Sequence, residues 1–315
     1  MVIKKVGKEV LAGQANSVFL SEKWLSIYDN GLEAYGIFNG DNQMIGGFVL
    51  YRQKRHGITY YRNPMYMPTI QLFFMNKSMN KAKILSENKK VMKALADFLS
   101  DLSYGVLSIY LPENHIDMQH FFWKNFKVVP NYTYHINMNQ SLDEIQKNYS
   151  AERRNDIKKA LKDGVTVELS NDLDLIKQMV SNTFSRKEKG YDKAMIDRIL
   201  FDFADNTNSF SYVSFQNDRA IAASFCLYDQ NKSYYLLGGY DSKNSHKGAG
   251  ALAVDAAIKH SKELEVKIFD FEGSMLPEVE KYFRGFGGDL IPYYSINKAY
   301  LPLEVALKFI NRSQF

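Results

Sequence analysis

One stretch limits what the chain can fold into more than any other: residues 264–288, with the sequence LEVKIFDFEGSMLPEVEKYFRGFGG. Its apolar start, Val266 to Phe271, predicts a strand, and Pro277 opens a short helix that a glycine cluster ends. The preceding residues, 235–252, predict another strand, a glycine-rich loop and the start of a helix. This order is typical of an α/β site that holds phosphate groups on backbone N–H groups.

Length and composition favour a globular protein of two domains. The chain has 315 residues, 45% hydrophobic and 24% charged, and one domain usually takes about 150 residues. The sequence shows neither a run of about 20 apolar residues nor a signal peptide, so we expect a cytoplasmic location. The formal net charge of +5 permits an anionic ligand such as a coenzyme or tRNA but does not require one.

The single cysteine, Cys226, lies within the apolar run from Ile221 to Tyr228. A cysteine in the middle of a strand predicts packing rather than a catalytic thiol, and its lack of a partner fits a reducing compartment. The six histidines are scattered and form no spacing typical of metal ligands, so we expect no metal.

Hydrophobic periodicity predicts the secondary structure of both halves. In the first half it predicts helices over 17–28, 81–102 and 116–124, and strands over 33–38, 43–51, 57–61, 106–110 and 132–138. In the second half it predicts helices over 141–162, 172–187, 193–204, 250–264 and 277–284, and strands over 165–169, 209–215, 220–228, 233–240, 266–271 and 290–296.

The two halves repeat one order of elements. The hexapeptide FFWKNF at Phe121 to Phe126 matches KYFRGF at Lys281 to Phe286, and a proline follows each, Pro130 and Pro292. Alternatively, aromatic and basic helix ends recur by chance. The duplication predicts two α/β domains of the α+β type, each a mixed, mostly antiparallel sheet flanked by helices. We place them at 1–140 and 141–298, with a C-terminal helix in 299–315 that packs back on the first domain.

The loop after Tyr240 is the strongest candidate for binding a donor molecule. Gly238 and Gly239 stand where a β-bulge would bend the preceding strand, and small residues then begin a helix beside two basic side chains. The competing interpretation is a flexible glycine loop. The residues predicted to bind the donor are Gly239, Ser245, His246, Lys247, Gly248, Ala249 and Gly250.

Several motifs resemble the GNAT-fold acyltransferases, and the whole chain resembles the tandem-GNAT proteins of the FemAB/FemX type. They are YSAERRNDIKKALKDG at Tyr149 to Gly164, GGYD at Gly238 to Asp241, SHKGAGAL at Ser245 to Leu252, FDFEGS from Phe269 and YFRGFGG at Tyr282 to Gly288. The resemblance implies two acyltransferase folds side by side, a substrate cleft between them and an acyl-CoA donor at the second-domain loop.

The sequence departs from the GNAT pattern at three places. Ser245 replaces the usual Gln or Arg of the coenzyme loop, and the tyrosine acid of single-domain enzymes aligns with Tyr282 or Phe283. The first half has no glycine loop between Tyr61 and Lys81, so we expect it to hold the acceptor and bind no donor.

Acyl transfer to an amine needs a base for the amine and hydrogen-bond donors for the oxyanion. Glu272 after a strand is the candidate base, Asp270 is a second carboxylate on the same strand, and Tyr240 is a candidate acid or oxyanion donor. A turn carboxylate on the surface is the alternative for Glu272.

Three arginines are candidates for binding an anionic group of a substrate. Arg284 ends a predicted helix, where it can equally stabilise that helix, and Arg153 and Arg154 lie in a basic segment that can equally be a solvated helix face.

The resulting hypothesis is an N-acyltransferase that moves an acyl group from acyl-CoA to an amine acceptor, which is a small molecule or a cell-envelope precursor. One alternative is a Fem-type transferase that uses aminoacyl-tRNA and acts on a cell-wall precursor. The other is a binding protein of the same fold without catalytic activity.

Overall fold

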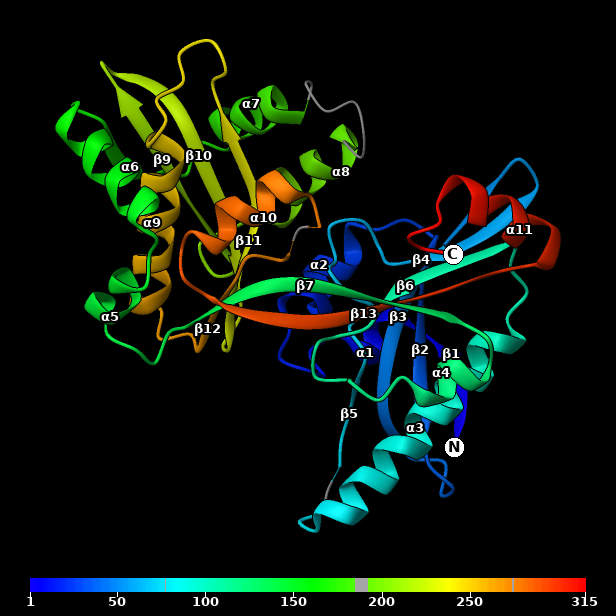
Figure 1. Cartoon of the computed structure of the whole chain (residues 1–315). Coiled ribbons are helices and arrows are strands. Elements are labelled where there is room, and N and C mark those ends of the chain that lie inside the picture. Colours follow the sequence, from blue (N-terminus) through cyan, green and yellow to red (C-terminus); the bar gives the residue numbers. More distant parts are fainter. Residues whose placement is uncertain (77, 185–191, 274) are drawn as a thin grey trace. The chain divides into compact units, whose positions relative to one another are not determined.

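The computed structural model describes residues 1–76, 78–184, 192–273 and 275–315, and Figure 1 shows its elements. The chain divides into two compact units. Unit 1 contains Met1–Asn131 and Pro292–Phe315, and unit 2 contains Tyr132–Ile291. Each unit has a mixed, mostly antiparallel sheet with flanking helices, which confirms the predicted fold class.

In unit 1 the strand order is β1-β2-β3-β4-β6-β13, and β5 pairs with β3. The long helix α3 packs Val91, Leu95 and Leu99 into the core of this unit. The elements are β1 (Val2–Val6), α1 (Lys8–Leu11), η1 (Val18–Leu20), α2 (Glu22–Ser26), β2 (Leu32–Phe38), β3 (Met44–Arg55), β4 (Ile58–Arg62), β5 (Phe73–Phe74), α3 (Lys81–Asp101), β6 (Val106–Tyr110), α4 (Gln119–Trp123), β13 (Asp289–Ala299) and α11 (Leu301–Ile310).

In unit 2 the strand order is β7-β12-β11-β10-β9-β8. The alanine-rich helix α9 is almost wholly buried and packs Ala251, Val254 and Ile258 into the core. The elements are β7 (Lys127–Asn137), α5 (Leu142–Lys147), α6 (Ala151–Lys162), β8 (Thr166–Leu169), α7 (Leu173–Phe184), α8 (Lys193–Asp197), the π-helix η2 (Arg198–Phe203), β9 (Ser209–Gln216), β10 (Arg219–Tyr228), β11 (Lys232–Tyr240), α9 (Ala249–Glu263), β12 (Ile268–Asp270) and α10 (Pro277–Arg284).

Among the residues that the structure describes, each unit contains one parallel pair of strands, and a long helix connects its members. In unit 1, α3 lies between β4 and β6, and in unit 2, α9 lies between β11 and β12. The other pairings within each unit are antiparallel. A repeated parallel crossover at the same place in both sheets is the structural counterpart of the repeated sequence order.

The limits of the units fall inside strands. From Tyr132 on, β7 belongs to unit 2, where His135 pairs with Asp270 of β12. From Pro292 on, β13 belongs to unit 1, where Ile296 pairs with Ile109 of β6. From the sequence we placed the domain limits at 140 and 298, on the assumption that each half of the chain completes its own sheet. In the structure, the last strand of each half lies in the other unit.

Most predicted elements are confirmed. The short elements β1, α1 and β5 were not predicted, and the other errors concern helix continuity. The helix predicted over 141–162 is two helices, because Ser150 accepts a hydrogen bond from the Arg153 N–H and starts α6 anew. The helix predicted over 193–204 changes to a π-helix at Arg198, and the one predicted over 17–28 is interrupted at Ser21. Residue 187, where a helix end was predicted, lies outside the described residues.

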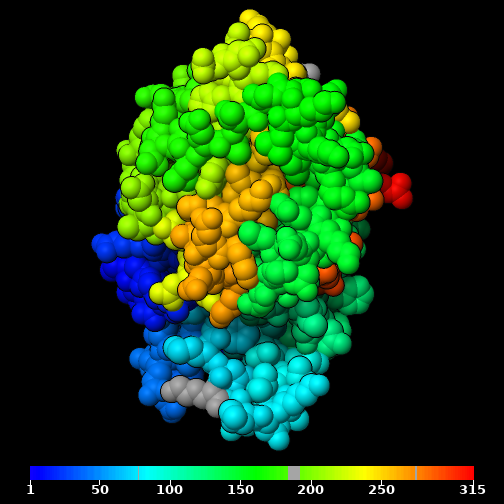
Figure 2. Space-filling model, turned by 90° about the vertical axis from the view of Figure 1, so that its left-hand side faces the viewer, coloured from blue at the N-terminus to red at the C-terminus, as the bar shows by residue number. Residues whose placement is uncertain are grey.

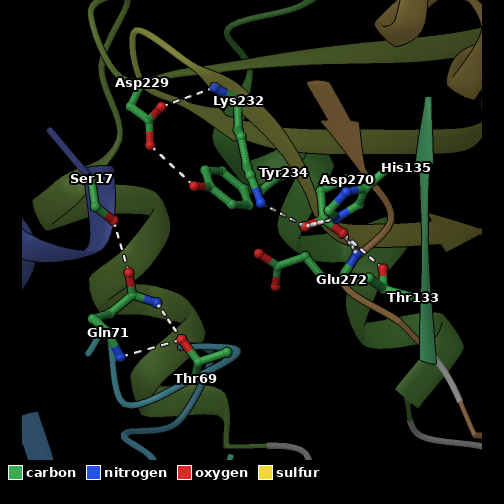
Figure 3. Close-up of polar contacts among 10 residues, drawn as sticks. All are labelled: Ser17, Thr69, Gln71, Thr133, His135, Asp229, Lys232, Tyr234, Asp270 and Glu272. Atoms are coloured by element: carbon green, nitrogen blue, oxygen red, sulfur yellow. Dashed lines mark hydrogen bonds and ion pairs between the residues drawn. The ribbon is translucent and has the colours of Figure 1, made fainter. Parts of the chain in front are cut away.

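In unit 1, residues 63–71 lie at the ends of β4 and β6. The Ile70 N–H donates to the Tyr110 carbonyl at 2.9 Å, and the Asn63 side chain accepts from the Tyr110 N–H at 2.8 Å. Gln71 adopts a left-handed conformation, φ +52°, and bonds the hydroxyls of Ser17 and Thr69 (Figure 3). Residues 63–71 are therefore tied to the end of β6.

Candidate functional site

In unit 2 the parallel strands β11 and β12 separate early. They pair only from Lys232 to Tyr234 against Ile268 to Asp270, and β11 then continues to Tyr240. A register shift opposite Phe225 and Cys226 leaves Leu236 as the extra residue of a β-bulge, which bends β11. The bulge predicted at Gly238 and Gly239 therefore lies at Leu236. Beyond Tyr234 and Asp270 the two strands diverge, and we call this divergence the fork. Glu272 lies just beyond the end of β12.

Glu272 has an unusual backbone and a buried side-chain oxygen without a partner. Its φ is +58°, a conformation that glutamate rarely adopts, and Gly273 follows with φ +75°. Its Oε1 atom is buried and has no hydrogen-bond partner among the described residues. In Figure 3 the carboxylate points away from Asp270 with no dashed line to a labelled neighbour. Two left-handed residues in succession thus turn the chain sharply and place a carboxylate with one buried oxygen at the turn.

Asp270, two residues earlier at the end of β12, is held by four groups (Figure 3). His135 Nε2 lies 2.8 Å from its Oδ2, and Lys232 Nζ lies 3.7 Å from the same atom. The Thr133 hydroxyl and the Glu272 N–H both donate to Oδ1 at 2.8 Å. Thr133, His135 and Asp270 are all at least nine-tenths buried. The network fixes the chain at the residue that precedes the turn.

The two carboxyl groups have opposite pKa shifts. Burial opposes the charge of Asp270, but the His135 hydrogen bond and charge, the Lys232 charge and the Thr133 hydroxyl outweigh it and lower the pKa of Asp270 to about 2. Burial, and then the Asp270 charge, raise the pKa of Glu272 well above its usual value, with Lys232 opposing. Two neighbouring carboxyl groups whose pKa values are shifted in opposite directions are typical of sites that carry out acid–base chemistry.

The predicted donor loop, residues 241–248, lies at the upper end of Figure 2, in yellow; residues 242–245 and Lys247 are exposed, whereas Asp241 and Gly248 are buried. The Gly248 N–H donates to His246 Nδ1 and the Ala249 N–H to the His246 carbonyl, so two N–H groups of the predicted cradle bond within the loop. A Cβ on Gly248 would lie 2.0 Å from the Asp156 carbonyl oxygen. Gly248 therefore allows α6 to pack closely on the start of α9.

The basic side chains of the loop are paired with acids. His246 Nε2 lies 3.1 Å from Asp163 Oδ2, and because His246 Nδ1 accepts from Gly248, Nε2 is the donor. Lys247 Nζ lies 3.3 Å from carboxylate oxygens of Glu152 and Asp156. These carboxylates offset the positive charge that the sequence places at this loop. Ser245 is exposed beside them.

Tyr282 on α10 lies at the start of α9. A Cβ added to Gly250 would be 3.3 Å from its hydroxyl oxygen, so the phenol faces the first turn of α9. Burial raises the pKa of Tyr282 to about 12, with the Arg153 charge opposing, so the phenol keeps its proton at neutral pH. The sequence left open whether Tyr282 or Phe283 takes this position. Phe283 is instead buried in the core.

The three candidate arginines all bond within unit 2. Arg153 is 6% exposed, stacks on the Tyr282 ring at 4.2 Å and lies 3.3 Å from Asp156. Arg154 donates to the carbonyl of Lys147, the last residue of α5, and to that of Tyr149, which lies between α5 and α6. Arg284 donates to Glu280 within α10 at 2.8 Å. Their assignment to substrate binding stays a prediction.

Gly239 and Tyr240 lie against α7. The Thr183 hydroxyl accepts from the Tyr240 N–H at 3.1 Å, and the Tyr240 side chain is 37% exposed at the end of β11. A Cβ on Gly239 would lie 2.3 Å from the Met179 carbonyl. The glycine is needed here for the close approach of α7, whether or not a donor binds.

Gly239→Ala is expected to destabilise the protein by about 1–3 kcal/mol, because the added methyl group meets backbone atoms that cannot move alone. Gly40→Ala is the matched control, since a Cβ there meets nothing within 4 Å. Urea unfolding of both variants measures the difference. Equal midpoints would show that α7 does not pack on Gly239 as described.

Sequence reasoning missed Thr133 and His135. They alternate along β7 with Tyr134 and Ile136, which enter the core, so the sequence could have indicated a polar face on this strand. The sequence could not have indicated that β7 pairs with β12, which lies far along the chain. Cys226 is buried in the same core, which confirms the packing role predicted for it. Among the described residues no group of three or more His, Cys, Asp or Glu is placed to hold a metal ion, and no helix is long and apolar enough to cross a membrane.

Comparison with known proteins agrees with this geometry. Residues 148–284 match the family described as acetyltransferase (GNAT) domain. Unit 2 carries a GNAT acetyltransferase domain. The match begins at Asn148 and ends at Arg284, so it includes α6, the fork and α10. A search of the curated proteins found no match.

Solved structures extend the likeness beyond the GNAT domain. The crystal structure of FemX covers 98% of this chain and 100% of its own at 13% identity, with a TM-score of 0.62. The C-terminal domain of a putative lysylphosphatidylglycerol synthetase from Agrobacterium fabrum covers 97% and 94% at 9% identity, with a TM-score of 0.57. A tandem GNAT protein from the clavulanic acid pathway covers 94% and 98% at 8% identity, with a TM-score of 0.52. At such identities the likeness concerns the fold alone, and it confirms the predicted fold of two GNAT-like domains.

Proposed function

We propose that the protein is an N-acyltransferase whose GNAT domain moves an acyl group from acyl-CoA to an amine, with Glu272 as the general base. The observation that carries the proposal is the buried, unpartnered Oε1 atom of Glu272 at the fork, as the described residues surround it. A buried carboxylate oxygen without a partner is costly, and it is typical of a group that acts on a ligand.

The proposed reaction uses the raised pKa of Glu272. Its ionised carboxylate is a stronger base than an ordinary glutamate and removes a proton from the ammonium form of the acceptor. The free amine attacks the thioester carbonyl, a C–N bond forms, the C–S bond breaks, and coenzyme A leaves as a thiolate that takes up a proton. Asp270 stays ionised and orients Glu272 through the Glu272 N–H, so we assign it a positioning role.

We assign Tyr282 to the donor-binding part of the site, beside the predicted loop. Its phenol keeps its proton at neutral pH and faces the first turn of α9, where N–H groups of the helix lack partners within the helix. Unit 1 is proposed to bind no donor, because residues 63–71 are tied to the end of β6.

A second candidate is aminoacyl transfer from aminoacyl-tRNA, as the sequence resemblance to the Fem-type proteins implies. One observation favours it: the acids Glu152, Asp156 and Asp163 pair with the basic loop residues and would oppose a diphosphate there. The base and the acyl-transfer chemistry are the same in both candidates.

Thiol release from acetyl-CoA in the presence of pooled amino sugars, amino acids and peptides tests the proposal. We expect release that depends on an amine and disappears in Glu272→Gln. Deacylation of aminoacyl-tRNA without thiol release would favour the second candidate. If neither donor is consumed by the wild-type protein, the chain is a binding protein and the proposed function is wrong.

A further inference from the structure

The C-terminal helix α11 has two apolar faces, and only one packs on the protein. Leu303 and Leu307 contact the cluster of Val106, Ala299 and Phe315 in unit 1. The other face carries apolar residues four positions apart, so they form one stripe along the helix. Its members are Leu301, Val305 and Phe309, exposed by 76%, 51% and 87%, with Ile310 next to them at 83%.

Basic side chains accompany this stripe. Residues 299–315 contain Lys308 and Arg312 against the single acid Glu304, a formal side-chain net charge of +1. Glu304 Oε1 lies 2.8 Å from Lys308 Nζ, so the one acid is neutralised along the helix. An apolar stripe with a basic border is complementary to an anionic lipid surface.

The dimensions of α11 argue against a second copy of the chain as the occupant. Its 10 residues give a length of about 15 Å, and a helix is about 10 Å wide, so the stripe offers roughly 150 Å². A stable dimer buries about 800 Å² on each partner.

We propose that α11 binds reversibly to the surface of an anionic membrane, with Leu301, Val305, Phe309 and Ile310 in the interface between head groups and acyl chains. The helix lies on the bilayer and does not span it. This inference does not depend on the proposed function, although an interfacial helix would bring the GNAT domain to acceptors carried by lipids.

Sedimentation of the full chain with vesicles tests the inference. We expect binding to vesicles that contain phosphatidylglycerol and weak binding to pure phosphatidylcholine vesicles. Phe309→Glu is expected to lower the partition coefficient at least about tenfold. Phe122→Glu is the matched control, since Phe122 is a 71% exposed aromatic residue on α4 of the same unit, and it should change the coefficient less than about twofold.

Several results would overturn the inference. Wild-type protein that sediments with neither vesicle does not bind membranes, and equal loss in Phe309→Glu and Phe122→Glu places the contact elsewhere than on α11. Equal binding to both lipid compositions contradicts an anionic surface. Gel filtration that shows a dimer lost in Phe309→Glu identifies a second copy as the occupant. Thermal melts of both variants should match wild type, because both side chains are largely exposed.

Discussion

Glu272→Gln is expected to lower the turnover number for acyl transfer about 10²–10⁴-fold, because it removes the proposed base and keeps the size of the side chain. The measurement is the initial rate of thiol release at saturating donor and amine. Glu278→Gln is the matched control, since Glu278 is exposed in the first turn of α10, and its rate should equal that of the wild type. Equal rates in Glu272→Gln and wild type would exclude Glu272 as the base.

The same substitution is expected to stabilise the folded protein. The pKa of Glu272 is raised in the folded state, so above about pH 4.5 the unfolded chain ionises while the folded protein still holds the proton. Wild-type stability therefore falls as the pH rises through this range, and the Glu272→Gln variant, which has no proton to lose at this position, does not show that fall. Urea unfolding should show a higher midpoint for the variant at pH 8 and no difference near pH 4. A lower midpoint at pH 8 would mean that the carboxylate has a stabilising partner.

Asp270→Asn is expected to have the largest effect on stability. It removes the charge that His135 and Lys232 face, and breaking such a buried pair costs roughly 3–5 kcal/mol. For a unit of this size that corresponds to a decrease of roughly 6–20 °C in melting temperature. Asp289→Asn, at an exposed position of β13, is the control and should melt like the wild type.

The pH dependence of Asp270 has the opposite sign to that of Glu272. Its pKa is lowered from 3.8 to about 2 in the folded state, so its contribution is fully present above pH 4 and is lost as the pH falls from about 4 to 2. A shift of this size corresponds to about 2 kcal/mol. The Asp270→Asn variant should therefore not show this loss of stability as the pH falls from about 4 to 2. An identical acid transition in wild type and variant would show that Asp270 is not held ionised by its neighbours.

Elements with clear local signals were predicted well. Pro277 and Gly285 define the limits of α10, and the alternating apolar residues of β6 define Val106–Tyr110. The break before α6 was missed, although Ser150 is a typical N-cap residue, because the helical periodicity continues across it. Local patterns therefore identified which elements exist more reliably than where neighbouring helices separate.

The candidate site was predicted in part. Glu272 and Asp270 were identified from their position after a strand, but the left-handed backbone of Glu272 was not, since glutamate has no preference for it. His135 reaches Asp270 only because β7 pairs with β12, a contact across 135 residues that one sequence does not reveal. The glycines near β11 were assigned to a bulge and a phosphate cradle, whereas Gly239 and Gly248 permit close packing of α7 and α6.

Titration of the Glu272 carboxyl is the most direct test of the account, and it needs no knowledge of the acceptor. Carbon-13 NMR of protein labelled at the glutamate carboxyl carbons, recorded across the acidic and neutral range for wild type and Glu272→Gln, identifies its resonance by difference. We expect one resonance, absent from the variant, that reports a pKa well above 4.5, the usual value of a glutamate carboxyl. A resonance that titrates at or below 4.5 would contradict this expectation, because Glu272 would then be an ordinary ionised carboxylate.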